Sequence, residues 1–322
     1  MLLLTGATGT VGSALLHRLT AAGSDVRCLV RDPRGLGTER VRVHIALGDL
    51  ADPPSFRNAL RGVDTVVHLA ASIRDQRSGS IEELNGIATW RMVSAAERAG
   101  VGHFVFTSAL GATTSNRARF MRAKALAEEA VTASAVPHTV LAPSVVYAPG
   151  DRYLTLLQRL ALGPAVPVPG RGRATVQPIW AQDVADCVMA VLDGRGDGRS
   201  RYELAGPETL THRAFVELVL RSAGRPRPLV QLPGPIASRS LRAVEWVLKG
   251  RTPATWDEAE LLEVSMTAAR GTADAQALGV TPRFIAAVLG PPRAPAGGRP
   301  RGGRPRLGRR GPGALPRPRA VR

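Results

Sequence analysis

A short apolar segment near the start of the sequence runs directly into three evenly spaced glycines. Leu2–Thr5 has the composition of a buried strand, and Gly6, Gly9 and Gly12 follow it as Gly-x-x-Gly-x-x-Gly. These glycines open an amphipathic pattern over residues 11–22 that is typical of a helix. A glycine turn lets the backbone reverse sharply and leaves the first N–H groups of the helix without partners. The chain is therefore constrained to begin with a strand–turn–helix unit.

Apolar strands and amphipathic helical segments continue to alternate through the first half of the sequence. This alternation, with short connections, predicts a doubly wound parallel α/β sheet of the Rossmann type with helices on both faces. The expected strands are residues 2–5, 25–30, 41–46, 65–68, 103–107 and 138–141, and the expected helices are residues 11–22, 54–61, 82–99 and 117–134.

The second half is less regular and predicts a smaller lobe. Its expected helices are residues 153–162, 183–192, 213–223, 236–249, 257–267 and 284–289, with strands at 174–180 and 201–204 and a loop at 163–172. We expect a sheet domain over residues 1–150 and a smaller C-terminal lobe over residues 151–290, interleaved with the sheet domain. The lobe is expected at the carboxyl ends of the strands, where such sheets bind ligands.

The basic charge of the chain is concentrated at its end. Removing the ten arginines of residues 291–322 from the formal net charge of +17 leaves +7 for residues 1–290. This segment is rich in proline, glycine and arginine, which predicts a disordered tail. It has no aromatic residue to stack on bases, so its composition favours a solvated extension over a nucleic-acid-binding arm.

Several function classes are disfavoured by residue content. Cys28 and Cys187 are the only cysteines, too few for a disulfide framework or a cysteine-rich zinc module. The histidines are scattered without metal-ligand spacing, so no metal is expected. No run of eighteen apolar residues occurs, and the initial segment lacks the basic region of a signal peptide. We therefore expect a cytoplasmic protein without a membrane span.

The glycine turn predicts a nucleotide site, with a plain tight turn as the alternative. The free N–H groups and the positive end of the helix dipole would face a pyrophosphate, and two threonine hydroxyls would add donors. The expected contacts are Gly6, Thr8, Gly9, Thr10, Val11 and Gly12.

The residues that follow the second strand indicate which dinucleotide fits. Arg31 stands where an arginine accommodates a 2′-phosphate, and Arg34 is placed to assist, which favours NADP. Asp32 leaves NAD open, because an acidic residue at this place binds the ribose hydroxyls instead.

Further segments line up in order at the ends of the expected strands and helices. They are Gly48-Asp49-Leu50, His68-Leu69-Ala70-Ala71, Asn85 with Gly86 and Thr89, Thr107-Ser108-Ala109, and Pro143-Ser144-Val145-Val146-Tyr147. Together with the glycine turn, they resemble the extended and atypical short-chain dehydrogenase/reductase superfamily over about residues 1–290. Within it, residues 108–112 and 143–154 are similar to bacterial relatives of the accessory NADPH-binding subunit of respiratory complex I. The NmrA-like proteins are a near alternative.

The resemblance implies further roles at the cofactor site. It implies that Asp49 bonds the adenine amino group and that Leu50 lies beside the ring. It places Leu69, Ala70 and Ala71 at the adenine-ribose side, and Pro143 and Val145 at the nicotinamide end. Gln182-Asp183-Val184-Ala185 matches a segment that starts a helix of the smaller lobe, where we expect Asp183 as the helix N-cap. His68 is expected as a packed or solvated residue at a strand end.

The residue at the usual catalytic position is the main departure from the superfamily. Its usual reaction needs Tyr-x-x-x-Lys on one helix and a serine near the fifth strand. Ser108 and Lys124 match, but Phe120 stands at the tyrosine position and has no ionisable proton. The resemblance implies catalytic or supporting roles for the serine and the lysine, and Lys124 would also bind ribose hydroxyls. Tyr147 and Tyr153 follow the sixth strand, but their hydroxyls cannot be placed from the sequence.

Three function classes follow. We predict an NADP(H)-binding atypical short-chain dehydrogenase/reductase that is an oxidoreductase on an unidentified small organic or quinone-like substrate and does not use the usual tyrosine. The alternative is a non-catalytic NADP(H)-binding redox sensor or assembly protein, which would have a protein partner. A nucleic-acid-associated protein using residues 291–322 ranks last.

Overall fold

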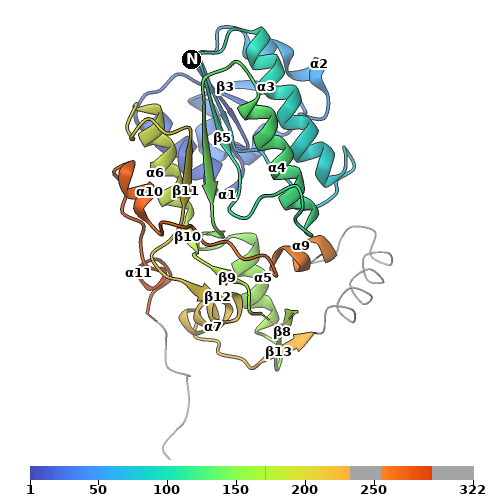
Figure 1. Ribbon diagram of the computed structural model, residues 1–322, viewed down its shortest axis with the longest axis vertical. Helices are drawn as coiled ribbons and strands as arrows, with labels where there is room; N and C mark the ends of the chain where they lie inside the picture. Colours follow the sequence, from blue (N-terminus) through green and yellow to red (C-terminus); the bar gives the residue numbers. More distant parts are fainter. Residues whose placement is uncertain (171, 233–254, 292–322) are drawn as a thin grey trace, which may run out of the picture.

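A seven-stranded, fully parallel sheet dominates the computed structural model, which describes residues 1–170, 172–232 and 255–291 (Figure 1). The strand order is β11-β6-β5-β4-β1-β2-β3. The strands are β1 (Leu2–Thr5), β2 (Val26–Val30), β3 (His44–Leu47), β4 (Thr65–His68), β5 (His103–Thr107), β6 (His138–Pro143) and β11 (Arg201–Leu204). The order reverses at β1 and β4, so the two halves of the sheet wind in opposite directions from its centre.

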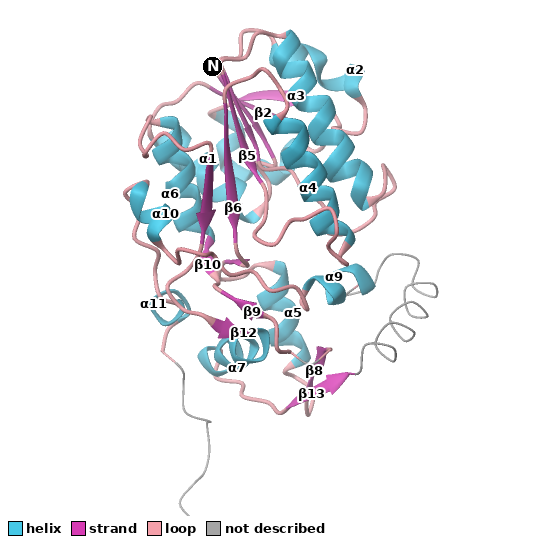
Figure 2. Cartoon of the chain, viewed as in Figure 1, coloured by secondary structure: helices cyan, strands magenta, loops and turns pink. Residues whose placement is uncertain are grey.

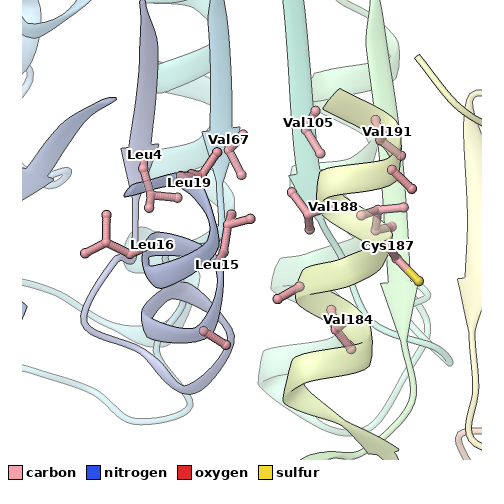
Figure 3. Packing of buried hydrophobic residues seen from close by; sticks show 14 of the residues in the cluster. Leu4, Leu15, Leu16, Leu19, Val67, Val105, Val184, Cys187, Val188 and Val191 are labelled. Carbon is pink, nitrogen blue, oxygen red and sulfur yellow. The ribbon is translucent and has the colours of Figure 1, made fainter. Parts of the chain in front are cut away.

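Helices cover both faces of the sheet because successive strand residues point to opposite sides. Leu3 belongs to the apolar core under α2 (Pro53–Phe56), η2 (Arg57–Leu60), α3 (Ala88–Arg98) and α4 (Arg119–Thr132), and η3 (Glu83–Ile87) runs directly into α3. Leu4 belongs to the opposite core, under α1 (Thr10–Ala21), α6 (Ala181–Leu192) and α10 (Ala273–Ala277). Figure 3 shows leucines of α1 and valines of α6 facing the strands.

A second, smaller part of the chain lies beyond the carboxyl ends of the strands (Figure 2). It contains three two-stranded pairs and has an apolar core of its own. The pairs are β7 (Val146–Tyr147) with β10 (Ile179–Trp180), β9 (Thr175–Val176) with β12 (Leu210–Thr211), and β8 (Val166–Pro169) with β13 (Leu229–Leu232). The helices are α5 (Arg152–Leu160), α7 (His212–Ser222), α9 (Trp256–Leu261) and α11 (Ile285–Leu289). In the described ranges, no helix has the length and apolar character needed to cross a bilayer.

The doubly wound sheet predicted from the alternating pattern is confirmed, and four strands have the expected bounds. Residues 174–180, expected as one strand, form the two short strands β9 and β10. Residues 163–172 were expected to be a loop, but Val166–Pro169 pairs with β13. Prolines are tolerated there because a two-stranded pair leaves one edge of each strand free. The helix expected at 236–249 lies outside the described residues, as does the tail expected at 291–322 apart from residue 291.

The placement of α6 differs from the expectation for the smaller lobe. Its apolar side packs with α1 against the sheet, and the next strand, β11, extends the sheet beside β6. Gln182–Ala185 therefore does not start a helix of the smaller lobe. The pattern predicts an apolar helix here, but it does not specify which apolar surface the helix covers.

Candidate functional site

The glycine turn brings two backbone segments into close contact at the end of β1. Gly6 has φ of +73°, and a Cβ atom there would lie 2.6 Å from the backbone nitrogen of Ala70. A Cβ at Gly12 would overlap the carbonyl oxygen of Gly6. Gly9 is the N-cap of α1, no side chain caps the helix, and its first turn holds no acidic residue. The N–H groups of this turn are therefore available to an anion.

A cavity of about 400 Å³ opens beside this turn at the carboxyl ends of β2, β3 and β4. Its lining includes most of the residues expected at the cofactor: Gly6, Thr8, Gly9, Arg31, Asp49, Leu50, Leu69, Ala70 and Ala71. The residues expected toward the nicotinamide end, Lys124, Pro143 and Val145, are not part of this lining. Thr10, Val11 and Gly12 form the first turn of α1. Contact of any of these residues with a cofactor stays a prediction.

Two arginines near the cavity differ in their charge balance. Arg34 is paired with Asp32, with its Nη2 2.8 Å from Oδ2, and the paired guanidinium lowers the pKa of the Asp32 carboxyl. Arg31 donates from Nη1 to the amide oxygen of Gln76 at 2.7 Å. Within the described part of the chain, no carboxylate lies within ion-pair distance of Arg31. The charge of Arg31 at the cavity rim is therefore not offset by an ion pair with a described residue, whereas the charges of Arg34 and Asp32 offset each other.

A buried asparagine fixes the loop that forms one wall of the cavity. Asn85 is 1% exposed, and its Oδ1 accepts from the backbone N–H of Ser72 at 3.0 Å. Its Nδ2 donates to the carbonyls of Ser72 and Ile81, each at 2.7 Å. Asn85 lies in η3, a π-helical segment, and such segments are frequent at functional sites. The sequence places Asn85 in a helix but does not show that it binds this loop.

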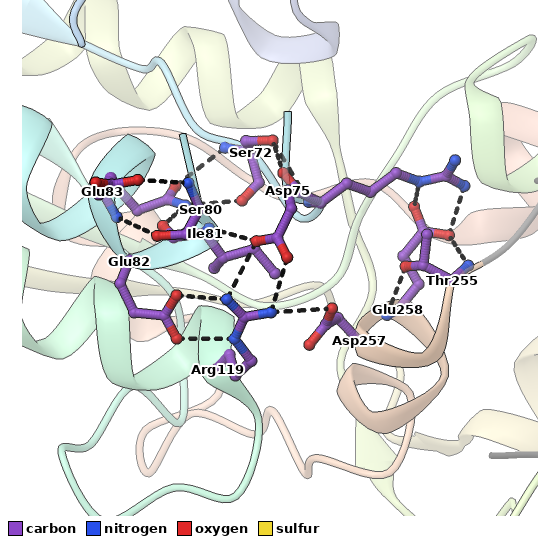
Figure 4. A network of polar contacts seen from close by, with 12 residues as sticks. Ser72, Asp75, Ser80, Ile81, Glu82, Glu83, Arg119, Thr255, Asp257 and Glu258 are labelled. Carbon is purple, nitrogen blue, oxygen red and sulfur yellow. Dashed lines mark hydrogen bonds and ion pairs between the residues drawn. The ribbon is translucent and has the colours of Figure 1, made fainter. Parts of the chain in front are cut away.

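The same loop is tied to α9 by a network of ion pairs (Figure 4). Arg119 contacts Glu82 at 2.6 Å, Asp75 at 3.1 Å and Asp257 at 3.4 Å, and the arginine lowers the pKa of Glu82. A second pair joins Arg74 to Glu258 with both side chains largely buried. The network joins the loop after β4, the start of α4 and α9, which sequence patterns do not associate.

His68 is a packed residue of the sheet, one of the two roles expected for it. Its Nδ1 lies 2.9 Å from the hydroxyl of Thr5, and its Nε2 lies 3.1 Å from the hydroxyl of Thr89. Burial, with a contribution from the Lys124 charge, lowers its pKa to about 3. The ring is therefore neutral at physiological pH, and both of its nitrogens are occupied by hydroxyl partners.

Lys124 and Ser108 are both buried at the carboxyl end of β5. The lysine is 3% exposed, its Nζ donates to the carbonyl of Thr107 at 2.6 Å, and it lies 5.9 Å from the ring centroid of Phe120. Burial lowers the pKa of Lys124 to about 7, although Glu128 favours the charged form. Within the described residues, the hydroxyls of Thr107 and Ser108 are buried without a hydrogen-bond partner. Buried hydroxyls without a partner are costly, so each of these two is free to bond to a water molecule or a bound group.

The two tyrosines that follow β6 belong to the apolar core of the smaller part of the chain. Tyr147 is fully buried, its ring packs against Phe215, and its hydroxyl has no partner within the described residues. Tyr153 lies 2.5 Å from Nε2 of His212 through its hydroxyl. Burial raises the pKa of both tyrosines and lowers the pKa of His212 to about 4. The Tyr153–His212 pair is therefore neutral near pH 7.

Asp183 was expected to be a helix N-cap, and that prediction is wrong. Trp180 is the N-cap of α6, and Asp183 lies within the first turn of the helix at 2% exposure. Its Oδ2 accepts from the backbone N–H of Arg283 at 2.8 Å. The helix begins two residues earlier than expected, at Ala181. The Asp183 carboxylate therefore does not cap the helix and instead binds the backbone of Arg283, 100 residues further along the chain.

Comparison with known proteins matches this chain to an NAD(P)H-binding family model and to two relatives over more than two thirds of its length. A family model described as NAD(P)H-binding matches residues 6–194. A mitochondrial subunit of Arabidopsis thaliana, NADH dehydrogenase [ubiquinone] 1 alpha subcomplex subunit 9, is 31% identical over 72% of this chain; the match spans 60% of that subunit's length. A Streptomyces griseus enzyme, (4-alkanoyl-5-oxo-2,5-dihydrofuran-3-yl)methyl phosphate reductase, is 32% identical over 76% of this chain and 81% of its own length.

Solved structures show the same fold at lower identity. The NADPH-dependent quinone oxidoreductase of Escherichia coli, solved with NADPH, matches with a TM-score of 0.70 at 18% identity. The match covers 90% of this chain and 98% of the other. It shows that the described fold is shared with a dinucleotide-dependent enzyme.

Replacing Gly12 with alanine tests the close contact at the turn. We expect Gly12→Ala to lower the free energy of unfolding by about 2 kcal/mol or more, because the new methyl group overlaps the Gly6 carbonyl. Chemical denaturation followed by circular dichroism measures the change. Gly86→Ala is the matched control, since its Cβ would meet no atom closer than 3.5 Å. Equal stability of the two variants would contradict the described packing.

The buried lysine predicts a specific pH dependence. The unfolded chain keeps the Lys124 proton up to about pH 10.4, whereas the folded chain keeps it only below about pH 7. The unfolded state therefore binds more protons between these values, and the stability contribution of this residue rises with pH across that window. We expect Lys124→Met to be more stable than the native protein at pH 6, with the difference shrinking toward pH 10. Thermal unfolding across this range measures it, and a difference independent of pH would refute the assignment.

Proposed function

This chain belongs to the NAD(P)H-binding family of atypical short-chain dehydrogenase/reductase proteins, and on that premise we propose that it is an NADPH-preferring oxidoreductase. Its substrate would be a small organic or quinone-like molecule. The observation that carries the proposal is the uncompensated guanidinium of Arg31 at the rim of the cavity beside the glycine turn. A guanidinium binds phosphate oxygens through fixed N–H donors, and a 2′-phosphate is the feature that separates NADPH from NADH.

The cofactor supplies a hydride when bound, and the protein supplies its binding and orientation. The N–H groups at the start of α1 would hold the pyrophosphate, and Thr8 would add a hydroxyl. Asp49 and Leu50 line the same cavity at the carboxyl end of β3, where the adenine would lie. Lys124 would support the nicotinamide ribose from its buried position beside Thr107.

The proton needed for carbonyl or quinone reduction cannot come from Phe120. The hydroxyl of Ser108 is buried and has no hydrogen-bond partner among the residues that the structure describes, which suits it to orient a substrate oxygen. We propose that water or a group of the substrate itself donates the proton.

A non-catalytic accessory role is the second candidate. It is favoured by the phenylalanine at the tyrosine position and by the similarity to a subunit named for NADH dehydrogenase. In that case the chain would bind NADPH without turnover and would act through a protein partner.

A cytoplasmic location is part of the proposal. Cys28 and Cys187 are both free and buried, and burial raises the pKa of each thiol to about 12. Neither cysteine takes part in a disulfide, which suits a reducing compartment.

The cofactor preference is tested by calorimetric titration of the purified protein with NADPH and with NADH. We expect tighter binding of NADPH, and we expect Arg31→Ala to weaken NADPH binding about tenfold or more with little effect on NADH. Arg57→Ala is the matched control, because Arg57 is an exposed arginine of η2 that does not line the cavity. Equal affinity of the native protein for both cofactors would exclude the NADPH preference.

Turnover separates the two candidate functions. We expect NADPH oxidation with at least one member of a panel of quinones, azo compounds, ketones and unsaturated lactones. Ser108→Ala should lower kcat by about tenfold or more without weakening NADPH binding, since the hydroxyl would act on the substrate oxygen. Tight NADPH binding with no turnover on the whole panel would contradict the oxidoreductase and support the accessory role.

A further inference from the structure

A neutral amide faces Arg31 from another segment of the cavity lining. Arg31 follows β2 and Gln76 lies in the loop after β4, 45 residues further along the chain. Nη1 of the arginine donates to Oε1 of the glutamine at 2.7 Å. Both side chains are exposed, so this bond closes across the cavity mouth rather than inside the core. The bond therefore directs the guanidinium of Arg31 toward the loop after β4.

The chemical type of this partner matters more than the bond itself. An amide oxygen accepts a hydrogen bond without cancelling the positive charge of the guanidinium. The neighbouring Arg34 shows the contrast, because the carboxylate of Asp32 holds it and offsets its charge. Of these two arginines, only Arg31 is both held in place and electrostatically available to an anion.

Gln76 is itself held at several points. Its Nε2 donates to the hydroxyl of Ser72 at 2.9 Å, and its backbone pairs with that of Gly79 through bonds of 2.9 and 3.2 Å. Asn85 is hydrogen-bonded to the backbone of Ser72. Arg74, two residues before Gln76, donates a hydrogen bond to Glu258 of α9. The amide of Gln76 is therefore set by the fold before any ligand enters. An arginine side chain positioned in advance loses less conformational entropy when it binds a phosphate.

We propose that Gln76 is a positioning residue for cofactor selectivity: it presents the charged guanidinium of Arg31 to a 2′-phosphate. The proposal deepens the proposed NADPH preference and rests on it. Gln76 acts through Arg31, so it contributes to the affinity ratio between NADPH and NADH and not to the binding of the shared dinucleotide.

The test replaces the amide with a carboxylate of the same shape. Gln76→Glu would form an ion pair with Arg31 and would repel a 2′-phosphate. We expect the dissociation constant for NADPH to rise about tenfold or more, with the constant for NADH changed less than about twofold. Gln276→Glu is the matched control, since it makes the same charge change at an exposed position on α10. NADH binding by each variant reports whether the cofactor site is intact.

A second variant separates positioning from simple repulsion. Gln76→Ala removes the hydrogen bond without adding a charge, and we expect it to weaken NADPH binding several-fold in the native background. In an Arg31→Ala background it should have no further effect, because its role passes through the arginine. Additive effects of the two substitutions would overturn the positioning role.

The outcomes distinguish this inference from the proposed function. If the native protein binds NADPH and NADH equally, the NADPH preference fails and the inference fails with it. If the native protein prefers NADPH and both Gln76 variants keep the native affinity ratio, the inference alone is refuted. A loss of NADPH preference in Gln76→Glu with the ratio kept in Gln276→Glu supports it.

Discussion

Close backbone approach at the turn between β1 and α1 is the constraint on which the rest of the site depends. Gly6 lies against the backbone of Ala70 at the end of β4, and Gly12 lies against Gly6 itself. β1 is hydrogen-bonded on both sides, to β2 and to β4, so this turn follows an interior strand of the sheet. Side chains at these glycines would separate the first helix from the strands. Their absence brings the start of the helix, with its free N–H groups, to the edge where the neighbouring strands end.

The arginines around this edge of the sheet differ in whether their partner is a carboxylate or a neutral group. Three arginines near the site are paired with carboxylates: Arg34 with Asp32, Arg74 with Glu258, and Arg119 with three acidic residues. These pairs stabilise loops and connect distant segments, but they leave little net charge to attract a ligand. Arg31 is held by an amide and is the exception among these four. Of these four arginines, Arg31 is therefore the one whose hydrogen-bond partner among the described residues carries no negative charge.

Cofactor binding and proton transfer are separable in this fold. The glycine turn and the cavity do not involve Phe120, and the buried lysine is held by the carbonyl of Thr107. Loss of the tyrosine hydroxyl removes one proton donor and leaves the binding geometry in place. The same scaffold therefore suits either an oxidoreductase with another proton source or a protein that binds the cofactor without turnover.

The sequence by itself determined the strand–turn–helix start and the parallel sheet, because these depend on periodicity and on glycine conformation within short segments. Residue patterns named Gly6, Thr8, Gly9 and Arg31, and the family resemblance named Asp49, Leu50, Leu69, Ala70 and Ala71; all of these line the cavity. The sequence also placed Ser108 and Lys124 at positions that match the superfamily's motif, and Phe120 at the position of its usual tyrosine. Only the tertiary structure decided that α6 covers the sheet, that Asp183 binds the backbone of Arg283, and that Gln76 holds Arg31. It alone joined Arg74 to Glu258 across 184 residues. Contacts of this kind arise when separate segments meet in space, and no local pattern of polar residues specifies which partner each side chain will find.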